Sequence, residues 1–204
     1  MLLLGYYHFR LPKSRIIPQY LRLMTYYHVV AMRQFSGIFL CLLSKHRGTM
    51  ISPSAKIHPL AYIEDNVSIG DNTVIGPFCI VRSGARIGSD CKFTAYCEIR
   101  EDVTIGDRTG FGSRCTISAG ATIGSDVSIK YSFVLTDTPN LKEGYIKSVG
   151  NIGDGALIGA NVTLMPGFSI GANSVIGACS QVRDNVGAGE VWFGSPAKLF
   201  KKND

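Results

Sequence analysis

An apolar residue returns at every sixth position through most of this chain. A first series runs from Ile51 to Ile129, and a second runs from Ile152 to Val182. A glycine often follows the apolar residue, and the fourth residue after it is small or apolar. Period six fits neither a helix nor a simple alternating strand. It predicts short strands joined by turns in which Gly, Asn or Asp tolerates a positive φ, so that the chain winds into a parallel β-helix.

The two series divide the chain into parts. Residues 1–50 lack the repeat, and we expect a basic, helical N-terminal segment there. The β-helix is expected over residues 51–187, and a C-terminal cap and tail over residues 188–204. Between the series the apolar position steps by 23 residues instead of six, so residues 130–151 are expected to leave the coil as a loop. Long loops in compact domains often carry function, which makes this loop the leading site candidate; its alternative role is to clasp a neighbouring subunit.

Positive charge is concentrated near the N-terminus. The net charge is +6, yet residues 1–63 contain eight basic residues and no acid. Residues 1–47 can therefore contact an anionic membrane surface, or they can form a helix that packs on the coil or on a neighbouring subunit. No apolar run is long enough to cross a bilayer, because Arg33 and Gln34 interrupt the best one. With no secretory pattern, we expect a cytoplasmic protein, peripheral on the inner membrane face if the segment binds lipid, and no nucleic-acid partner.

Four cysteines occupy the small inward position of their hexads: Cys79, Cys91, Cys97 and Cys115. A thiol at such a position serves as a small hydrophobic group. Because Cys79, Cys97 and Cys115 are three hexads apart, they are expected to stack in neighbouring coils. No metal site is expected, since this ladder offers neither a tetrahedral arrangement nor a histidine partner.

The late coils carry a specific series of motifs. In order they are Ile158-Gly159-Ala160-Asn161-Val162, Pro166-Gly167, Ile176-Gly177-Ala178-Cys179-Ser180 and Gly194-Ser195-Pro196-Ala197-Lys198. Their order and spacing resemble the hexapeptide-repeat acyltransferases, in particular the acetyl-CoA-dependent sugar acetyltransferases. The resemblance covers residues 51–198 and implies a mainly β protein, a left-handed parallel β-helix with three hexads per coil, assembled as a homotrimer. The hand follows from the resemblance alone, because parallel crossovers are usually right-handed.

The resemblance also implies where acetyl-CoA would bind. The pantetheine arm lies between two late coils in this family, which places Gly159, Ala160, Gly177 and Ala178 beside it, although each glycine is also explained by its turn. By charge and position, Arg183 and Lys198 are candidates for the coenzyme's phosphates, or they are solvated surface charges. Acetyl transfer further requires donors for the thioester oxygen and a way to remove the acceptor's proton.

The base that the family uses for this proton is a histidine in or near the loop, and here it is missing. The chain has only His8, His28, His46 and His58. His58 lies four coils from the loop, roughly 19 Å at about 4.8 Å per coil, and the others could help only if the N-terminal segment folds along the coil.

The loop offers Thr136-Asp137-Thr138-Pro139-Asn140 instead. Asp137 is the catalytic candidate, as proton acceptor or as an anchor for an amine, with Thr136, Thr138 and Asn140 as substrate contacts. The alternative is that Asp137 and Thr138 only set the turn before Pro139.

Three functions are compatible with these observations. The first is acetyl-CoA-dependent O-acetylation of a sugar in surface polysaccharide biosynthesis. The second is N-acetylation of a nucleotide amino sugar, because an amine with a pKa near 8 is partly neutral at physiological pH and attacks without a base. The third is a non-catalytic trimeric scaffold. Carbonic anhydrase of the same fold is not expected, since its three metal-binding histidines are absent.

Overall fold

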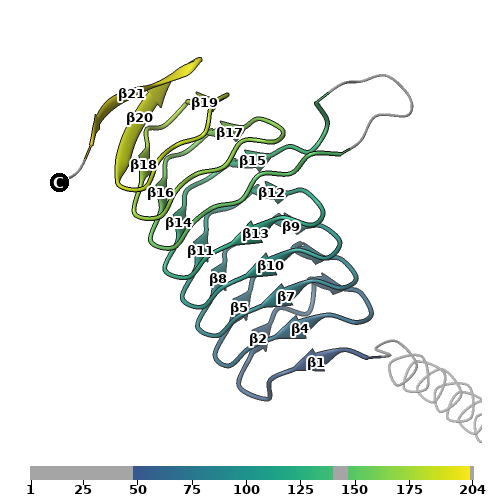
Figure 1. Ribbon diagram of the computed structural model, residues 1–204. Helices are drawn as coiled ribbons and strands as arrows, with labels where there is room; N and C mark the ends of the chain where they lie inside the picture. Colours follow the sequence, from purple (N-terminus) through teal and green to yellow (C-terminus); the bar gives the residue numbers. More distant parts are fainter. Residues whose placement is uncertain (1–47, 140–146, 203–204) are drawn as a thin grey trace, which may run out of the picture. The chain divides into compact units, whose positions relative to one another are not determined.

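The computed structural model of the protein describes residues 48–139 and 147–202 (Figure 1). Within these ranges the chain forms a left-handed parallel β-helix built from strands, with no helix. The expected mainly β fold is therefore confirmed. The expected helical, basic segment of residues 1–50 lies outside the described residues except for residues 48–50. No described helix could serve as a membrane span.

The coil has three sheets, and the chain visits them in the order A, B, C. Sheet A contains β1 (Met50–Ile51), β4 (Ser68–Ile69), β7 (Arg86–Ile87), β10 (Thr104–Ile105) and β13 (Thr122–Ile123). Sheet B contains β2 (Lys56–Ile57), β5 (Val74–Ile75), β8 (Lys92–Phe93), β11 (Gly110–Phe111), β14 (Ser128–Ile129), β16 (Leu157–Ile158), β18 (Val175–Ile176), β20 (Glu190–Gly194) and β21 (Ala197–Lys202). Sheet C contains β3 (Tyr62–Ile63), β6 (Ile80–Val81), β9 (Glu98–Ile99), β12 (Thr116–Ile117), β15 (Val134–Leu135), β17 (Thr163–Leu164) and β19 (Gln181–Val182).

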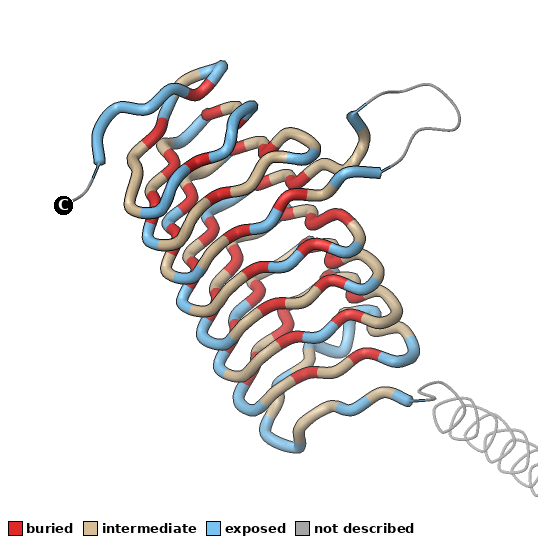
Figure 2. The backbone as a smooth tube through the Cα atoms, in the orientation of Figure 1, coloured by how far each residue is buried: buried red, intermediate tan, exposed pale blue. Residues whose placement is uncertain are grey.

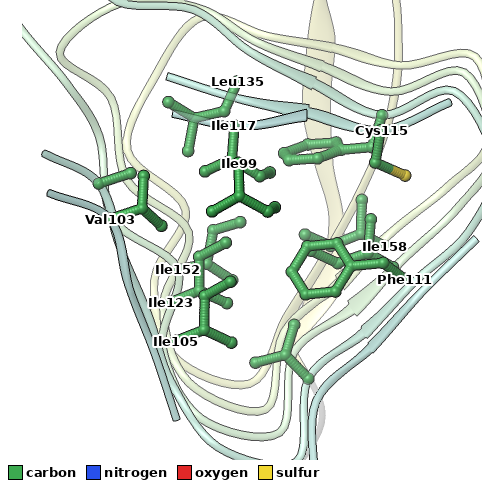
Figure 3. Packing of buried hydrophobic residues seen from close by; sticks show 14 of the residues in the cluster. Ile99, Val103, Ile105, Phe111, Cys115, Ile117, Ile123, Leu135, Ile152 and Ile158 are labelled. Carbon is green, nitrogen blue, oxygen red and sulfur yellow. The ribbon is translucent and has the colours of Figure 1, made fainter. Parts of the chain in front are cut away.

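Strand register explains the six-residue period. Ile69 pairs with Ile87, and Ile87 with Ile105, so each coil takes three hexads. From β4 to β19 the second residue of each strand is buried, and Figure 2 shows these buried positions following one another along the coil. Figure 3 shows the side chains of Ile105, Ile123 and Ile152 stacked in one such column. Phe93 and Phe111 stack with their ring centroids 4.6 Å apart. The inward columns are nearly fully buried, and their apolar burial is the main force that holds such short strands together.

The cysteine ladder lies in the core as expected. Cys79, Cys91, Cys97 and Cys115 are at most 1% exposed, and they are free thiols. The Cys97 thiol donates to the Gly112 carbonyl over 3.1 Å. A small, weakly polar group at this position fills the core without leaving its hydrogen atom unpaired.

The excursion is shorter than the sequence predicted. The loop expected over residues 130–151 starts too early, because Phe133 and Leu135 are fully buried and β15 pairs with β12 and β17.

The hexad that ends in β15 does not stand out in the sequence, because Phe133 occupies an inward position that other hexads fill with a smaller residue. Paired residues in neighbouring coils are 18 positions apart before the excursion and 29 positions apart across it, as in Ile129 with Ile158. The excursion therefore adds 11 residues before Ile152 rejoins the coil beside Ile123 and Ile170.

The C-terminal end of the coil is closed by a hairpin. β20 continues sheet B beside β18, placing Trp192 over Ile176, and β21 returns antiparallel to β20 (Figure 1). The Trp192 ring is 9% exposed, and its Nε1–H donates to Glu190 over 2.9 Å. Trp192 therefore covers Ile176, the last inward residue of the two-residue strands in sheet B.

Candidate functional site

The turns between sheets form two edges of the coil that matter for the site. We call the turns that follow sheet B the B–C corner; their first residues are His58, Gly76, Thr94, Gly112, Lys130, Gly159 and Gly177. We call the turns that follow sheet C the C–A corner; their first residues are Glu64, Arg82, Arg100, Ser118, Thr136, Met165 and Arg183.

The four residues assigned to the pantetheine arm lie together on the B–C corner. Gly159 and Ala160 stack on Gly177 and Ala178, because Ile158 pairs with Ile176 in neighbouring coils. A Cβ on Gly159 would lie 2.5 Å from the Ala178 nitrogen, and a Cβ on Gly177 would lie 2.8 Å from the Phe193 Cβ. Close packing between coils therefore requires both glycines, whatever else they do.

Some backbone N–H groups at this corner donate hydrogen bonds to the next coil, and others do not. The Gly159 N–H donates to the Ile176 carbonyl and the Gly177 N–H to the Trp192 carbonyl, each over 2.8 Å. Within the described ranges, the N–H groups of Ala160 and Ala178 donate to no protein acceptor. The alanines, and not the glycines, are thus the residues whose N–H groups remain open to a ligand.

The loop candidates lie on the C–A corner, at the root of the excursion. The Thr136 hydroxyl donates to the Leu164 carbonyl over 2.9 Å, so it is engaged in the coil. The Thr138 hydroxyl donates to Asp137 Oδ1 over 2.9 Å, and Lys147 Nζ lies 3.2 Å from Asp137 Oδ2. Asn140 lies outside the described residues. A main-chain hydrogen bond also joins the two ends of the excursion, since the Ser148 N–H donates to the Asp137 carbonyl over 2.9 Å.

Asp137 is held as a carboxylate. Its side chain is 16% exposed, and this partial burial acts to raise its pKa. The hydrogen bonds from Thr138 and Lys147 outweigh burial and leave the pKa of Asp137 below its ordinary value. A carboxylate stabilised in this way accepts hydrogen bonds readily but is a weak base.

The two cationic candidates are solvent-exposed. Arg183 follows β19 on the C–A corner and has no acidic partner within the described part of the chain. Lys198 Nζ lies 3.8 Å from Asp184 Oδ2, and both side chains are mostly exposed. Such a pair contributes little to stability, so Lys198 remains available to an anionic ligand.

The structure therefore does not bring all the candidates together in one chain. The arm residues lie at one edge of sheet C, and Asp137 and Arg183 lie at the other edge. His58 is also remote. It is on the B–C corner five pairing steps from Gly159, roughly 24 Å at about 4.8 Å per step, and its Nδ1 accepts the Leu60 N–H over 3.1 Å.

Sequence reasoning missed a hollow on sheet B, next to the B–C corner. Its volume is about 210 Å³, and its lining includes Lys92, Gly110, Ser128, Lys130 and Tyr131. One signal was present in the sequence: Gly110 precedes the inward residue of its hexad, whereas the turn glycines follow theirs. A larger hollow of about 370 Å³ lies at the first coils, lined by Glu64 and Ser83 among others, where Arg82 already pairs with Glu64 over 2.8 Å.

Comparisons with known families cover both halves of the coil. A family model described as the GMPPB C-terminal domain matches residues 46–147, half of the chain, and the bacterial transferase hexapeptide model (six repeats) matches residues 151–184. The acyl-[acyl-carrier-protein]–UDP-N-acetylglucosamine O-acyltransferase of Brucella ovis is 48% identical over 40 residues, which make up 20% of this chain and 14% of that protein. The same enzyme of Brucella canis matches equally well.

Two solved structures share the fold. The crystal structure of UDP-N-acetylglucosamine acyltransferase has a TM-score of 0.68 at 18% identity and covers 76% of this chain, while this chain covers 62% of that one. The polySia-specific acetyltransferase NeuO has a TM-score of 0.55 at 21% identity, covering 78% of this chain and 84% of its own. From its repeat, its coil and the two family models, the chain belongs to the hexapeptide-repeat family of β-helix proteins.

Proposed function

We propose that the protein is an acetyltransferase that uses acetyl-CoA to acetylate a sugar, in the synthesis of surface polysaccharide. The observation that carries the proposal is the late B–C corner. Two neighbouring turns there each begin with Gly-Ala, and the N–H groups of Ala160 and Ala178 have no acceptor in the described chain. Such a strip accommodates a narrow, amide-containing pantetheine arm, and the two Brucella relatives named above are acyltransferases.

The reaction needs an acceptor at the thioester. The acceptor's oxygen or nitrogen bonds to the carbonyl carbon, the carbon–sulfur bond breaks, and the acceptor's proton passes to the departing thiolate. Open N–H groups beside the thioester can stabilise the oxyanion that forms on the way. Asp137 then serves to hold the acceptor by accepting a hydrogen bond.

We further propose a homotrimer with the site between subunits. Within one chain, sheet C separates Asp137 and Arg183 from the arm residues. In a closed assembly of parallel coils, the C–A corner of one subunit can lie beside the B–C corner of the next. Three equivalent sites then form, each with a coenzyme strip from one chain and a loop root from its neighbour.

One observation favours a second candidate, the N-acetylation of a nucleotide amino sugar. Within the described residues His58 is remote, and the pKa of Asp137 is lowered, so neither is suited to take a proton from a hydroxyl. An amine that is already neutral needs no base.

The test is an incubation of the purified protein with acetyl-CoA and a panel of hydroxy- and amino-sugars, followed by detection of released coenzyme A thiol. We expect release that depends on one class of acceptor, and that class decides between O- and N-acetylation. If the protein binds no acetyl-CoA, the enzyme proposal fails and a trimeric scaffold becomes the better account.

A further inference from the structure

Neither backbone conformation nor close packing requires a glycine at Gly110. It is the outward residue of β11 and has no positive φ, and a Cβ placed on it would meet nothing within 4 Å. Among the glycines that the structure describes, no other combines these two properties. A glycine inside a strand costs roughly 0.5–1 kcal/mol relative to alanine. A glycine in a strand marks a bulge, a tight bend, or the close approach of a ligand or another backbone.

The missing side chain opens the hollow of about 210 Å³ on sheet B. Lys92 lies one strand before Gly110 and Ser128 one strand after it, while Lys130 and Tyr131 form the adjoining turn. This volume is below the roughly 300–1,000 Å³ of pockets that enclose a complete drug-sized ligand. The hollow therefore suits one end of a ligand, on the scale of a single sugar ring or its charged substituent.

The charge around the hollow is uncompensated. Neither Lys92 nor Lys130 has an acidic partner within residues 48–139 and 147–202. The turns of the B–C corner contain no Asp or Glu at all, and Arg114 adds a further cation. Two ammonium groups that line one hollow repel each other, and an oxyanion between them removes that repulsion.

The remaining lining suits a sugar. The hydroxyls of Ser128 and Tyr131 have no hydrogen-bond partner among the described residues, and the Tyr131 side chain is 60% exposed. A hydroxyl can bond the hydroxyls of a sugar, while an exposed aromatic ring offers an apolar face to its C–H groups.

The hollow adjoins the proposed coenzyme strip. The Lys130 N–H donates to the Ile158 carbonyl over 2.9 Å, and the Asn161 N–H donates to the Tyr131 carbonyl over 2.8 Å. Lys130 and Tyr131 are thus one coil, about 4.8 Å, from Gly159 and Ala160.

We propose that this hollow binds an anionic sugar, one that carries a phosphate or a carboxylate, with Lys92 and Lys130 on the anionic group. As the acceptor site of the acetyl transfer, the assignment rests on the proposed function. As a binding site it can be measured without acetyl-CoA.

The test compares three probes of similar size: glucose 1-phosphate, glucuronate and neutral glucose. Dissociation constants are measured by titration at low salt. We expect at least one of the two anions to bind at least tenfold more tightly than glucose, and the tighter anion identifies phosphate or carboxylate as the natural group. Equal, weak binding of all three probes would overturn the proposal.

Gly110→Val is the decisive variant, because it fills the hollow at a position where a side chain meets no neighbour. It should keep or raise the melting temperature and weaken the tighter anion at least tenfold. Thr122→Val, an exposed outward position on sheet A, is the matched control and should bind as the wild type does. Lys130→Gln should remove the preference for the anion over glucose.

Two results would contradict this assignment. One is unchanged anion binding by Gly110→Val. The other is an altered oligomeric mass of this variant, which would assign the glycine to a contact between copies. The outcome is separate from that of the proposed function. Anion binding without thiol release from acetyl-CoA would refute the acetyltransferase and keep the site, and thiol release without anion binding would do the reverse.

Discussion

The two corners on either side of sheet C use charge in opposite ways. On the C–A corner, charged side chains are mostly paired: Arg82 contacts Glu64 and Glu98, Arg100 contacts Glu101, and Asp137 contacts Lys147.

On the B–C corner there is no acidic residue, and Lys130 and Arg114 have no ionic partner in the described chain. Paired charges on a coil stabilise the stacking of its turns modestly. Unpaired charges beside open N–H groups contribute nothing to the coil and are available to an anionic ligand. The difference supports our proposal that the B–C corner binds an anionic ligand, while the C–A corner supplies a fixed carboxylate at the loop root.

The largest effect is expected from Asp137→Asn. Removing the carboxylate that holds the acceptor should lower kcat by about 100-fold, the order of loss expected when a reacting group is no longer correctly placed, and should leave the affinity for acetyl-CoA nearly unchanged. Steady-state kinetics and a separate coenzyme titration measure both. An unchanged kcat would remove Asp137 from the mechanism and leave the C–A corner purely structural.

The pH dependence of the rate sharpens this prediction. Because the pKa of Asp137 is lowered, the carboxylate is present at neutral pH and its protonation should reduce kcat only below the ordinary aspartate pKa of about 3.9. Lys147→Met removes a hydrogen bond and a positive charge, and it should move this acidic limb to higher pH. If the acidic limb of Lys147→Met stays at the wild-type pH, the assignment of this limb to Asp137 is contradicted.

Glycines on and beside the B–C corner should respond in opposite directions. Gly159→Ala places a Cβ 2.5 Å from the backbone of the next coil, and it should destabilise the fold by about 1–3 kcal/mol. Gly110→Ala meets no neighbour and should stabilise it by about 0.5–1 kcal/mol. Thermal unfolding of the two variants checks the contrast, and equal melting temperatures would refute the view that only Gly159 is required by packing.

Arg183→Ala should weaken acetyl-CoA binding about tenfold, the loss expected for one charge-assisted contact to a phosphate, with a smaller effect on kcat. Lys198→Ala serves as the comparison, since Lys198 also has Asp184 within 3.8 Å. Calorimetric titration with acetyl-CoA measures both. A wild-type affinity in the Arg183 variant would make this residue a solvated surface charge.

The smallest effect is expected inside the B–C corner. The hydrogen bond with the Cys115 thiol raises the pKa of Cys97 to about 11, so the thiol is neutral at physiological pH. Cys97→Ala should cost on the order of 1 kcal/mol of unfolding free energy through a small cavity. Denaturant unfolding measures the loss, and acetyl-CoA binding should persist; its disappearance in a folded variant would contradict a packing role.

The sequence determines the coil more completely than the site. Apolar residues at a six-residue spacing identify the inward positions of the coil, and the positions of the short strands follow from them directly. The hexad at Phe133 was missed because a large side chain occupies a position that is usually small. The pair of Asp137 and Lys147 joins residues on either side of the excursion, a contact that no local pattern encodes. The role of Gly110 depends on the emptiness around it, which appears only once neighbouring strands are in place.

In the proposed trimer, each site combines the B–C corner of one chain with the C–A corner of another. Co-expression of Asp137→Asn with Ala178→Trp, each expected to keep no more than about 1% of the activity alone, tests it directly, since Ala178 is exposed. In randomly mixed trimers about one site in four receives two intact corners, so purified mixtures should recover about a quarter of the wild-type rate. If the site lies within one chain, every site carries one of the two substitutions, and the mixture would remain inactive.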